Sequence, residues 1–322
     1  MRRLIIIALT FVMAALGPAP ASAQSYPTKP IRVIVPFAAG GAVDVLARLV
    51  SAKMSESVGQ PVIIENRAGA AGNVAADAVA KSPPDGYTIL QNTNGQAISP
   101  SLYKSLPFDA VKDFTPVTQL VASQLLLVAT PSLPAKSVQE LIALAKAQPG
   151  KLNYASAGVG SGIHLGTVLF AETAGIDLTH IPYKGSGPAL TDLLGGHVQI
   201  YFSSLPPAVG LVKEGKLHAL GVTGLKRSAS FPDVPTVAEQ GLPGFEAVLH
   251  YGIVAPAGTP RAIVDKLNAA LCTALDDPKV RGHIATEGAE PLSMSPDEYA
   301  ADIDREETRW SALVRKSNSQ AK

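Results

Sequence analysis

The sequence predicts an α/β fold with two lobes joined by two crossings of the chain. Three observations lead to this expectation. Short apolar runs alternate with helical patterns along most of the length, which is typical of largely parallel sheets covered by helices. Two proline-containing segments divide the chain, and each part holds one glycine-rich turn between a strand and a helix. Lobes arranged in this way can close on a ligand about a hinge.

The first 23 residues have the pattern of a removable export signal. Arg2 and Arg3 give a basic start, Leu4 to Leu16 form an apolar core, and Ala21-Ser-Ala23 offers a small-residue cleavage site. The apolar core is shorter than the about 20 residues that cross a bilayer. The paired arginines also suit twin-arginine export, which is the less favoured alternative. No cysteine follows the cleavage site, so we expect a soluble periplasmic protein without a lipid anchor that begins near Gln24.

Composition excludes several classes of protein. Removing residues 1–23 leaves 299 residues, a length that suits two domains. The signal holds two arginines and no acids, so the mature chain has 25 Lys and Arg against 26 Asp and Glu. This near-neutral balance, without a basic run, argues against nucleic acid or an anionic membrane as a partner. Cys272 is the only cysteine, so no internal disulfide can form.

Nine apolar runs have the length and the flanking turns of strands. In chain order they are Arg32–Pro36, Val62–Glu65, Thr88–Gln91, Leu125–Thr130, Leu152–Ala155, His180–Pro182, Val198–Phe202, His218–Val222 and Gly252–Ala255.

Helix starts are marked by capping residues. Ser137 with Glu140 forms a capping box, and Ser295 with Glu298 forms another, in which Pro296 takes the first helical position. Thr259-Pro260 marks a third helix start in a similar way.

Two segments have the composition of connectors between domains. Leu120–Pro134 runs from an apolar strand into Pro-Ser-Leu-Pro, and Phe231–Pro243 carries three prolines and a glycine. We therefore assign residues 24–125 and 248–322 to a first lobe and residues 126–247 to an inserted second lobe. Two crossings between the lobes would form the hinge.

The most informative stretch links the first strand to the first helix. Pro36 is followed by Phe37, Ala38, Ala39, Gly40 and Gly41, and then by a helix with apolar Val43, Leu46, Ala47, Val50 and Met54. Backbone N–H groups at a helix start have no partner inside the helix, and they attract anions without a basic side chain. In an exported protein, this loop predicts capture of a small carboxylate.

The second lobe holds a comparable loop between a strand and a helix. It contains Ser156, Gly158, Gly160, Ser161, Gly162 and His164, and Ser161 can cap the helix. Small residues let a ligand approach the backbone closely. Each loop alone could be merely a tight turn, but the pair favours a ligand site with one loop on each side. His164 could bind the ligand or hold its own loop, and the sequence does not separate these roles.

Other polar residues follow strands where ligands gather in α/β sheets. Asn92 and Thr93 offer neutral hydrogen bonds in the first lobe, and Ser203 and Ser204 do so in the second. Two charged residues fit structural roles better. We expect Asp44 to stabilise the first helix rather than meet an anion, and Arg67 to brace the loop that follows it.

Motifs for catalysis, cofactors and metals are incomplete. Gly158-Val-Gly160-Ser-Gly162-Ile163 lacks the last glycine of the dinucleotide fingerprint, and no Gly-Lys-Ser/Thr motif occurs. Ser156 lacks the first glycine of a hydrolase elbow. Six histidines are scattered without metal-ligand spacing. We therefore expect no catalytic residues, no cofactor and no metal site.

The chain resembles the extracytoplasmic solute receptors of tripartite tricarboxylate transporters, known as the Bug family. The matching segments run nearly end to end over the mature chain. They are Tyr26-Pro-Thr-Lys-Pro-Ile-Arg32, Val35-Pro-Phe-Ala-Ala-Gly-Gly41, Glu65-Asn-Arg67, Pro84-Asp-Gly-Tyr-Thr88, Tyr154-Ala-Ser156, Gly158 to Leu165, Pro182-Tyr-Lys-Gly185, Asp192-Leu-Leu-Gly-Gly196, Asp233-Val-Pro-Thr236, Ala255-Pro-Ala-Gly-Thr-Pro260 and Arg309-Trp310.

The resemblance implies a monomeric, two-lobed periplasmic binding protein fold that holds a small carboxylate between its two glycine-rich loops. Backbone groups and waters would bind the ligand, and membrane transporter subunits of the tripartite type would receive it. Two departures from the family pattern, Gly195-Gly-His-Val-Gln199 and His250-Tyr251, prevent the ligand class from being copied from a relative. A sensory receptor for a membrane kinase is the alternative function, and a hydrolase using Ser156 or Ser161 is the least favoured, because no base accompanies either serine in the sequence.

Overall fold

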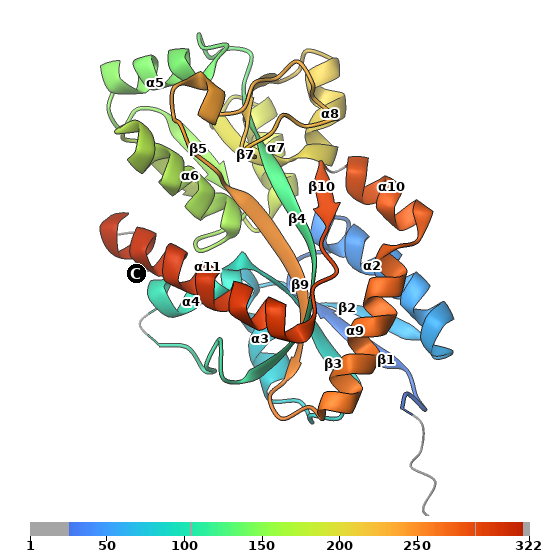
Figure 1. The fold of residues 1–322 in the computed structure, drawn as a ribbon. Coiled ribbons are helices and arrows are strands. Elements are labelled where there is room, and N and C mark those ends of the chain that lie inside the picture. Colours follow the sequence, from blue (N-terminus) through green and yellow to red (C-terminus); the bar gives the residue numbers. More distant parts are fainter. Residues whose placement is uncertain (1–25, 104, 287, 318–322) are drawn as a thin grey trace, which may run out of the picture.

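The computed structural model describes residues 26–103, 105–286 and 288–317, so the expected export signal lies outside the described residues. Figure 1 shows two α/β lobes connected by two long strands that run side by side. The α/β class and the two-lobed fold predicted from the sequence are confirmed.

The first lobe is built around parallel strands from the N-terminal part of the chain. Strands β2, β1 and β3 are parallel neighbours, and β9 pairs antiparallel with the other side of β3. The elements are β1 (Ile31–Val35), α2 (Ala42–Val58), β2 (Val62–Asn66), η1 (Ala70–Gly72), α3 (Asn73–Ala80), β3 (Thr88–Thr93), α4 (Asn94–Leu102), β9 (Val248–Pro256), α9 (Arg261–Leu275), α10 (Pro278–Thr286), β10 (Ala289–Pro291) and α11 (Pro296–Ser317).

The second lobe repeats the parallel arrangement. Strand β5 pairs in parallel with β6 and with β7. The elements are α5 (Val138–Ala147), β5 (Asn153–Ser156), α6 (Gly162–Ala174), β6 (Thr179–Pro182), α7 (Ser186–Leu194), β7 (Ile200–Ser204), α8 (Leu205–Lys213), β8 (His218–Val222) and η2 (Ala238–Gln240).

Strand β4 (Phe114–Ala129) belongs to both lobes. Its first part, up to Gln124, pairs antiparallel with β9, and Gln124 lies opposite Val248. From Leu125 onward, β4 pairs with β7 and β8 instead. The first crossing of the chain is therefore a continuous strand, and the second lies between Ala247, whose N–H donates to the carbonyl of Thr223, and Val248, where β9 begins. The sequence predicted only the part of β4 from Leu125, because the stretch before it mixes polar residues with Pro116.

Most other expected strands form within one or two residues of their expected ends. Strand β9 starts four residues before the expected Gly252, and the short β10 was not expected. The expectation that Phe231–Pro243 crosses between the lobes is wrong. This segment lies beside β8, where Val237 N–H donates to the carbonyl of Val222.

Helix α11 packs against both lobes. Its Trp310 is buried with Ile98 and Leu102 of α4 and with Leu165 and Val168 of α6. Figure 1 shows this C-terminal helix passing below α6 and beside α4. Because it contacts a helix from each lobe, α11 braces the hinge region from outside the two crossing strands.

The capping box expected at Ser295 forms completely, whereas at Ser137 the carboxylate of Glu140 accepts the N–H of Lys136 instead of that of Ser137. Ser137 Oγ accepts a hydrogen bond from the N–H of Glu140, and Ser295 Oγ accepts one from the N–H of Glu298. The Glu298 carboxylate accepts the N–H of Ser295 in return. Reciprocal bonds therefore fix the start of α11, and the Ser137 N-cap fixes the start of α5.

Candidate ligand site

The first glycine-rich loop is open at the start of α2. Ala38 to Gly41 are exposed, and Phe37 is half-buried. Gly41 is the N-cap of α2, and no side chain caps this helix. Gly40 has φ +85°, a conformation that glycine adopts without strain. The first N–H groups of α2 therefore remain available to an anion from outside.

Asp44, in the first turn of α2, stabilises this loop through hydrogen bonds. It is buried, and its carboxylate accepts hydrogen bonds from the N–H of Gly40 at 2.8 Å and from Nδ2 of Asn66 at 2.8 Å. Arg48 binds both of its oxygens, at 3.0 and 2.9 Å. Burial would raise the pKa of Asp44, but the hydrogen bonds from Arg48, Gly40 and Asn66 lower it overall. The structural role expected for Asp44 is therefore the one that its contacts support.

A tight turn that the sequence analysis treated only as a loop lies next to Pro36. In η1, Ala70 and Ala71 both have positive φ, 45° and 53°. A Cβ on Gly72 would lie 3.0 Å from Cβ of Pro36, and one on Gly95 would lie 3.1 Å from the carbonyl oxygen of Ala71. Left-handed backbone at non-glycine residues costs roughly 1–2 kcal/mol each and is found at ligand clamps. Arg67 was expected to brace the loop that follows it, but its side chain instead pairs with Glu65 of β2 at 2.6 Å.

The second glycine-rich loop is bonded mainly to itself. Ser156 Oγ accepts the N–H of Gly158 at 3.1 Å, and Nδ1 of His164 accepts the N–H of Gly160 at 3.2 Å. Ser161 caps α6 by accepting the N–H of His164, and its hydroxyl donates to the carbonyl of Gly158 at 2.8 Å. His164 therefore holds its own loop. The N–H groups of Gly158 and Gly160 therefore bond within the loop and point inward.

A histidine that the sequence analysis missed lies beside this loop. Nε2 of His180 is 2.6 Å from Oγ of Ser156, and its ring stacks on that of His164 with centroids 4.2 Å apart. Burial, and after it the neighbouring His180, lower the pKa of His164 to about 3, while burial lowers the pKa of His180 to about 4. Both rings are therefore neutral near pH 7. The two histidines and the serine come from β5, β6 and α6, so only the folded sheet brings them together.

The second loop also touches the first lobe. Tyr103 donates its phenolic proton to the carbonyl of Val159 at 3.4 Å. A Cβ on Gly160 would lie 2.8 Å from Cδ1 of Leu102, and one on Gly162 would overlap Leu249. The structure thus packs the second loop on α4 and η1. Between residues 37–41 and 156–164, all of which are described, the structure shows no hydrogen bond. Residues of η1 approach both Pro36 and the second loop, since a Cβ on Gly72 would lie 3.0 Å from Pro36 and one on Gly160 would lie 3.9 Å from Cβ of Ala71.

The other expected polar contacts lie inside strands. Asn92 ends buried in β3, where its Oδ1 accepts the phenolic proton of Tyr299 at 2.7 Å. Thr93 is the N-cap of α4 and accepts the N–H of Gly95. Ser203 and Ser204 are buried in β7, and the hydroxyl of Ser203 donates to the carbonyl of Ser204. Strands β3 and β7 extend two residues further than the apolar runs indicated, which explains this placement.

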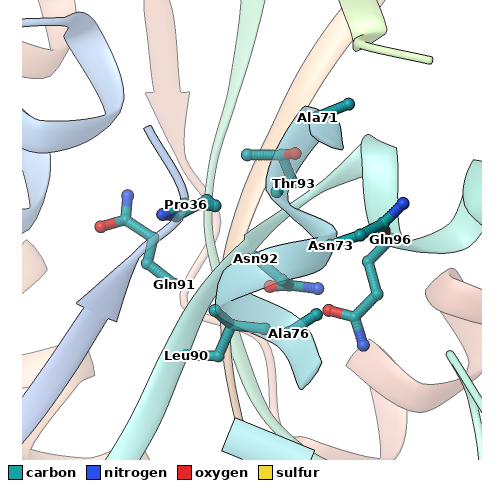
Figure 2. A pocket seen from close by; sticks show the side chains of 10 residues that line it. Pro36, Ala71, Asn73, Ala76, Leu90, Gln91, Asn92, Thr93 and Gln96 are labelled. Carbon is teal, nitrogen blue, oxygen red and sulfur yellow. The ribbon is translucent and has the colours of Figure 1, made fainter. Parts of the chain in front are cut away.

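A small cavity lies inside the first lobe, between η1, α3, β3 and α4. It has a volume of about 10 Å³ and is lined by residues that include Ala71, Asn73, Asn92, Thr93 and Gln96, from η1, α3, β3 and α4 (Figure 2). This volume suits about one water molecule rather than a carboxylate ligand. Nδ2 of Asn73 and Oε1 of Gln96 are buried there without a partner. The cavity is too small to be the ligand site itself.

Metal-binding clusters and membrane-spanning helices are both absent from the described part of the chain. Residues 26–103, 105–286 and 288–317 contain no group of three or more His, Cys, Asp and Glu side chains placed to hold a metal ion. Within the same ranges, no helix is both long and apolar enough to cross a membrane.

Comparisons with known proteins extend over nearly the whole chain. The model of a family described as the tripartite tricarboxylate transporter family receptor matches residues 46–319. Protein BugT of Bordetella pertussis is 40% identical over 324 residues, which cover 100% of this chain and 99% of BugT. Rpa4515 of R. palustris, solved with adipate, is 38% identical with a TM-score of 0.86, covering 91% of this chain and 98% of that one. MatC of Rhodopseudomonas palustris, solved with bound malate, is also 38% identical with a TM-score of 0.84, covering 90% and 100%.

Proposed function

This chain belongs to the family of tripartite tricarboxylate transporter receptors, and on that premise we propose that it captures a small carboxylate in the periplasm and delivers it to a membrane transporter. The similarity to Bug proteins, first indicated by sequence motifs, is confirmed. Adipate and malate, which occupy Rpa4515 and MatC, are both small dicarboxylates, and this supports the same ligand class here. In this proposal the protein is a receptor without catalytic activity.

The uncapped start of α2 carries the proposal. Its exposed loop, Phe37 to Gly41, presents backbone N–H groups and holds no basic side chain. The buried Asp44 carboxylate would repel an anion, but Arg48 binds both of its oxygens and offsets its charge. The partial positive charge of the helix start can therefore act on a ligand carboxylate. We place the carboxylate here, in contact with the first lobe.

The second loop then supplies the opposite wall of the site. Its residues Ser156, Gly158, Gly160, Ser161, Gly162 and His164 bond to each other, so the loop keeps its shape without the ligand. No hydrogen-bond acceptor among the described residues takes the N–H groups of Ala157 and Val159, so these two are free to donate to the ligand or to bridging water. We assign ligand contacts to the first loop, to the free backbone N–H groups of the second loop and to Thr93, and structural roles to Asn92, Ser203 and Ser204.

Binding in this proposal closes the two lobes on each other. The lobes are residues 24–125 with 248–322 and residues 126–247, and the protein acts as a monomer. A ligand that touches both lobes stabilises the closed form over the open form, and only this difference in affinity shifts the population. The backbone would bend near Leu125, where β4 passes from one sheet to the other, and near Val248, where β9 begins.

Identification of the bound compound tests the proposal. The protein should be purified without denaturation from the periplasm and measured by native mass spectrometry, before and after the ligand is dissociated. We expect the mass difference to match a small mono-, di- or tricarboxylic acid. Deletion of the gene should then abolish uptake of that acid by the cell. A bound sugar or peptide would contradict the ligand class, and unchanged uptake would contradict the transport role.

A further inference from the structure

The stacked histidines beside the second loop have a role that the ligand contacts alone do not explain. We propose that His180 is a positioning residue, which acts through Ser156 and together with His164 to hold the second loop with the N–H groups of Gly158 and Gly160 turned away from the ligand. This inference rests on the proposed function, because it assigns a task to the wall of the same site.

Hydrogen bonding fixes the protonation of His180. Ser156 Oγ accepts the N–H of Gly158 at 3.1 Å, and Nε2 of His180 lies 2.6 Å from the same oxygen. No other acceptor for the Ser156 proton lies within hydrogen-bonding distance among the described residues. The hydroxyl must therefore donate to Nε2, because a buried hydroxyl proton without an acceptor is costly. His180 then carries its own proton on Nδ1.

His164 has the opposite arrangement. Its Nδ1 accepts the N–H of Gly160 at 3.2 Å, so its proton lies on Nε2. Each neutral imidazole therefore accepts one hydrogen bond that fixes the loop, directly in His164 and through Ser156 in His180. A proton added to either accepting nitrogen would turn that acceptor into a donor and break the bond. The two histidines form complementary anchors for the backbone at Gly158 and Gly160.

Packing keeps both rings in place. Tyr154 and His180 lie opposite each other on parallel strands β5 and β6, and their ring centroids are 4.8 Å apart with an interplanar angle of 14°. His164, from α6, stacks with His180 at 4.2 Å and 18°. Tyr154 and His164 are each only 5% exposed. The three rings therefore form one stack beneath the loop, and rotation of either imidazole would lose these contacts.

A nucleophilic Ser–His pair is the competing interpretation, since the two side chains are within hydrogen-bonding distance. A nucleophile must reach its substrate, yet Ser156 is 0% exposed and its oxygen already accepts the N–H of Gly158. No carboxylate among the described residues pairs with His180 to orient it as a base. The geometry therefore fits positioning of the backbone and not attack on a substrate.

The inward bonds determine which donors face the cleft. With Gly158 and Gly160 turned inward, the intervening Val159 and the preceding Ala157 keep their N–H groups free. The carbonyl of Val159 meets Tyr103 of the first lobe. Loss of the His180 anchor would let the loop rotate, and both the free donors and the contact with Tyr103 would lose their fixed positions.

Imidazole NMR on the ligand-free full-length mature protein tests the protonation pattern. Long-range ¹H–¹⁵N spectra at pH 7 distinguish protonated from unprotonated ring nitrogens. We expect a proton on Nδ1 of His180 and on Nε2 of His164. A proton on Nε2 of His180, or a charged ring at either residue, would overturn the inference.

Amide hydrogen exchange at Gly158 tests the positioning role itself. His180→Phe keeps a ring for stacking but loses the acceptor, so exchange at Gly158 should rise about fivefold, the value of a hydrogen bond worth about 1 kcal/mol. His180→Gln restores an acceptor and should return the rate to near that of the unmodified protein, and His197→Phe is the control on the same lobe. Unchanged exchange in His180→Phe, or no recovery in His180→Gln, would overturn the role. Neither measurement uses a ligand, so failure of the carboxylate assignment is detected separately.

Discussion

The phenolic oxygen of Tyr103 in the first lobe lies 3.4 Å from the carbonyl oxygen of Val159 in the second. A Cβ on Gly160, the next residue, would lie 2.8 Å from Cδ1 of Leu102, so a side chain there would force Leu102 to move. The second loop therefore has two tasks, to face the ligand and to contact the first lobe. Any change that moves this loop should affect ligand binding and lobe closure together.

Substitution of the two loop glycines should weaken binding for different reasons. Gly160→Val adds a side chain against Leu102 at a residue with φ +86°, whereas Gly40, with φ +85°, has no atom within 4 Å of the added Cβ. We expect Gly160→Val to reduce affinity by about 100-fold, and Gly40→Ala, which puts a methyl group into the open space that the ligand would occupy, by roughly 10-fold. Calorimetry with the ligand identified from the purified protein measures both. Lys184→Ala is the control, and a larger loss there than in either glycine variant would contradict anchoring by backbone groups.

Removal of Arg48 should weaken anion binding, because the unpaired charge of Asp44 would repel the ligand. Arg48→Ala leaves the Asp44 carboxylate, which is 2% exposed, without its ion pair below the first loop. We expect affinity for the carboxylate to fall about tenfold at low salt, and less in 0.5 M salt because screening weakens the repulsion. The matched control is Arg32→Ala, which breaks an exposed pair with Glu65 on a neighbouring strand. Equal effects of the two variants would contradict the role assigned to Asp44 and Arg48.

Stability should fall as the pH is lowered from neutral. The pKa values of His164 and His180 in the folded protein are about 3 and about 4, below the value of about 6.5 expected in the unfolded chain. Between about pH 6.5 and pH 4 the unfolded chain therefore binds protons that the folded chain does not, and the free energy of unfolding decreases as the pH falls through this window. We expect His180→Phe to show a smaller loss of melting temperature between pH 7 and pH 4.5 than the unmodified protein, by roughly 2–4 °C. The same pH dependence in both proteins would contradict a buried neutral His180.

Lobe closure predicts a change in overall size. Small-angle X-ray scattering should give a smaller radius of gyration with saturating ligand than without it, because the lobes move together about β4 and β9. Calorimetry on the same sample establishes saturation. Identical scattering curves for the two states would exclude the hinge mechanism.

Periodicity and capping allowed much of the fold to be predicted. The apolar face of α2, with Leu46, Val50 and Met54, is buried as expected, and the capping box at Ser295 forms. Long strands that contain polar residues were harder to recognise. Strand β4 keeps Thr118 and Gln119 fully buried in a strand that joins two sheets, so its hydrophobic pattern is interrupted.

The candidate site was predicted at the level of loops but not of contacts. Glycine spacing identified both loops, because only such residues suit the backbone there. The direction of each N–H group depends on side chains that the fold supplies from elsewhere. His180 is 24 residues from Ser156 and reaches it only because β5 and β6 pair in one register. Likewise, the phenolic hydroxyl of Tyr299 in α11 donates to Oδ1 of Asn92, which is 207 residues away in the sequence.

The most direct test of the central claim is a thermal-shift screen of the purified protein after its bound ligand has been removed. The panel contains dicarboxylates such as malate and adipate, tricarboxylates, acidic amino acids, aromatic acids and sugars. A ligand that binds only the folded state raises the melting temperature, by an amount that corresponds to about 2.7 kcal/mol when its concentration is 100 times Kd. We expect stabilisation by at least one carboxylate and none by its neutral amide analogue or by any sugar. Stabilisation by a sugar alone, with every carboxylate without effect, would contradict the claim that the start of α2 binds a carboxylate.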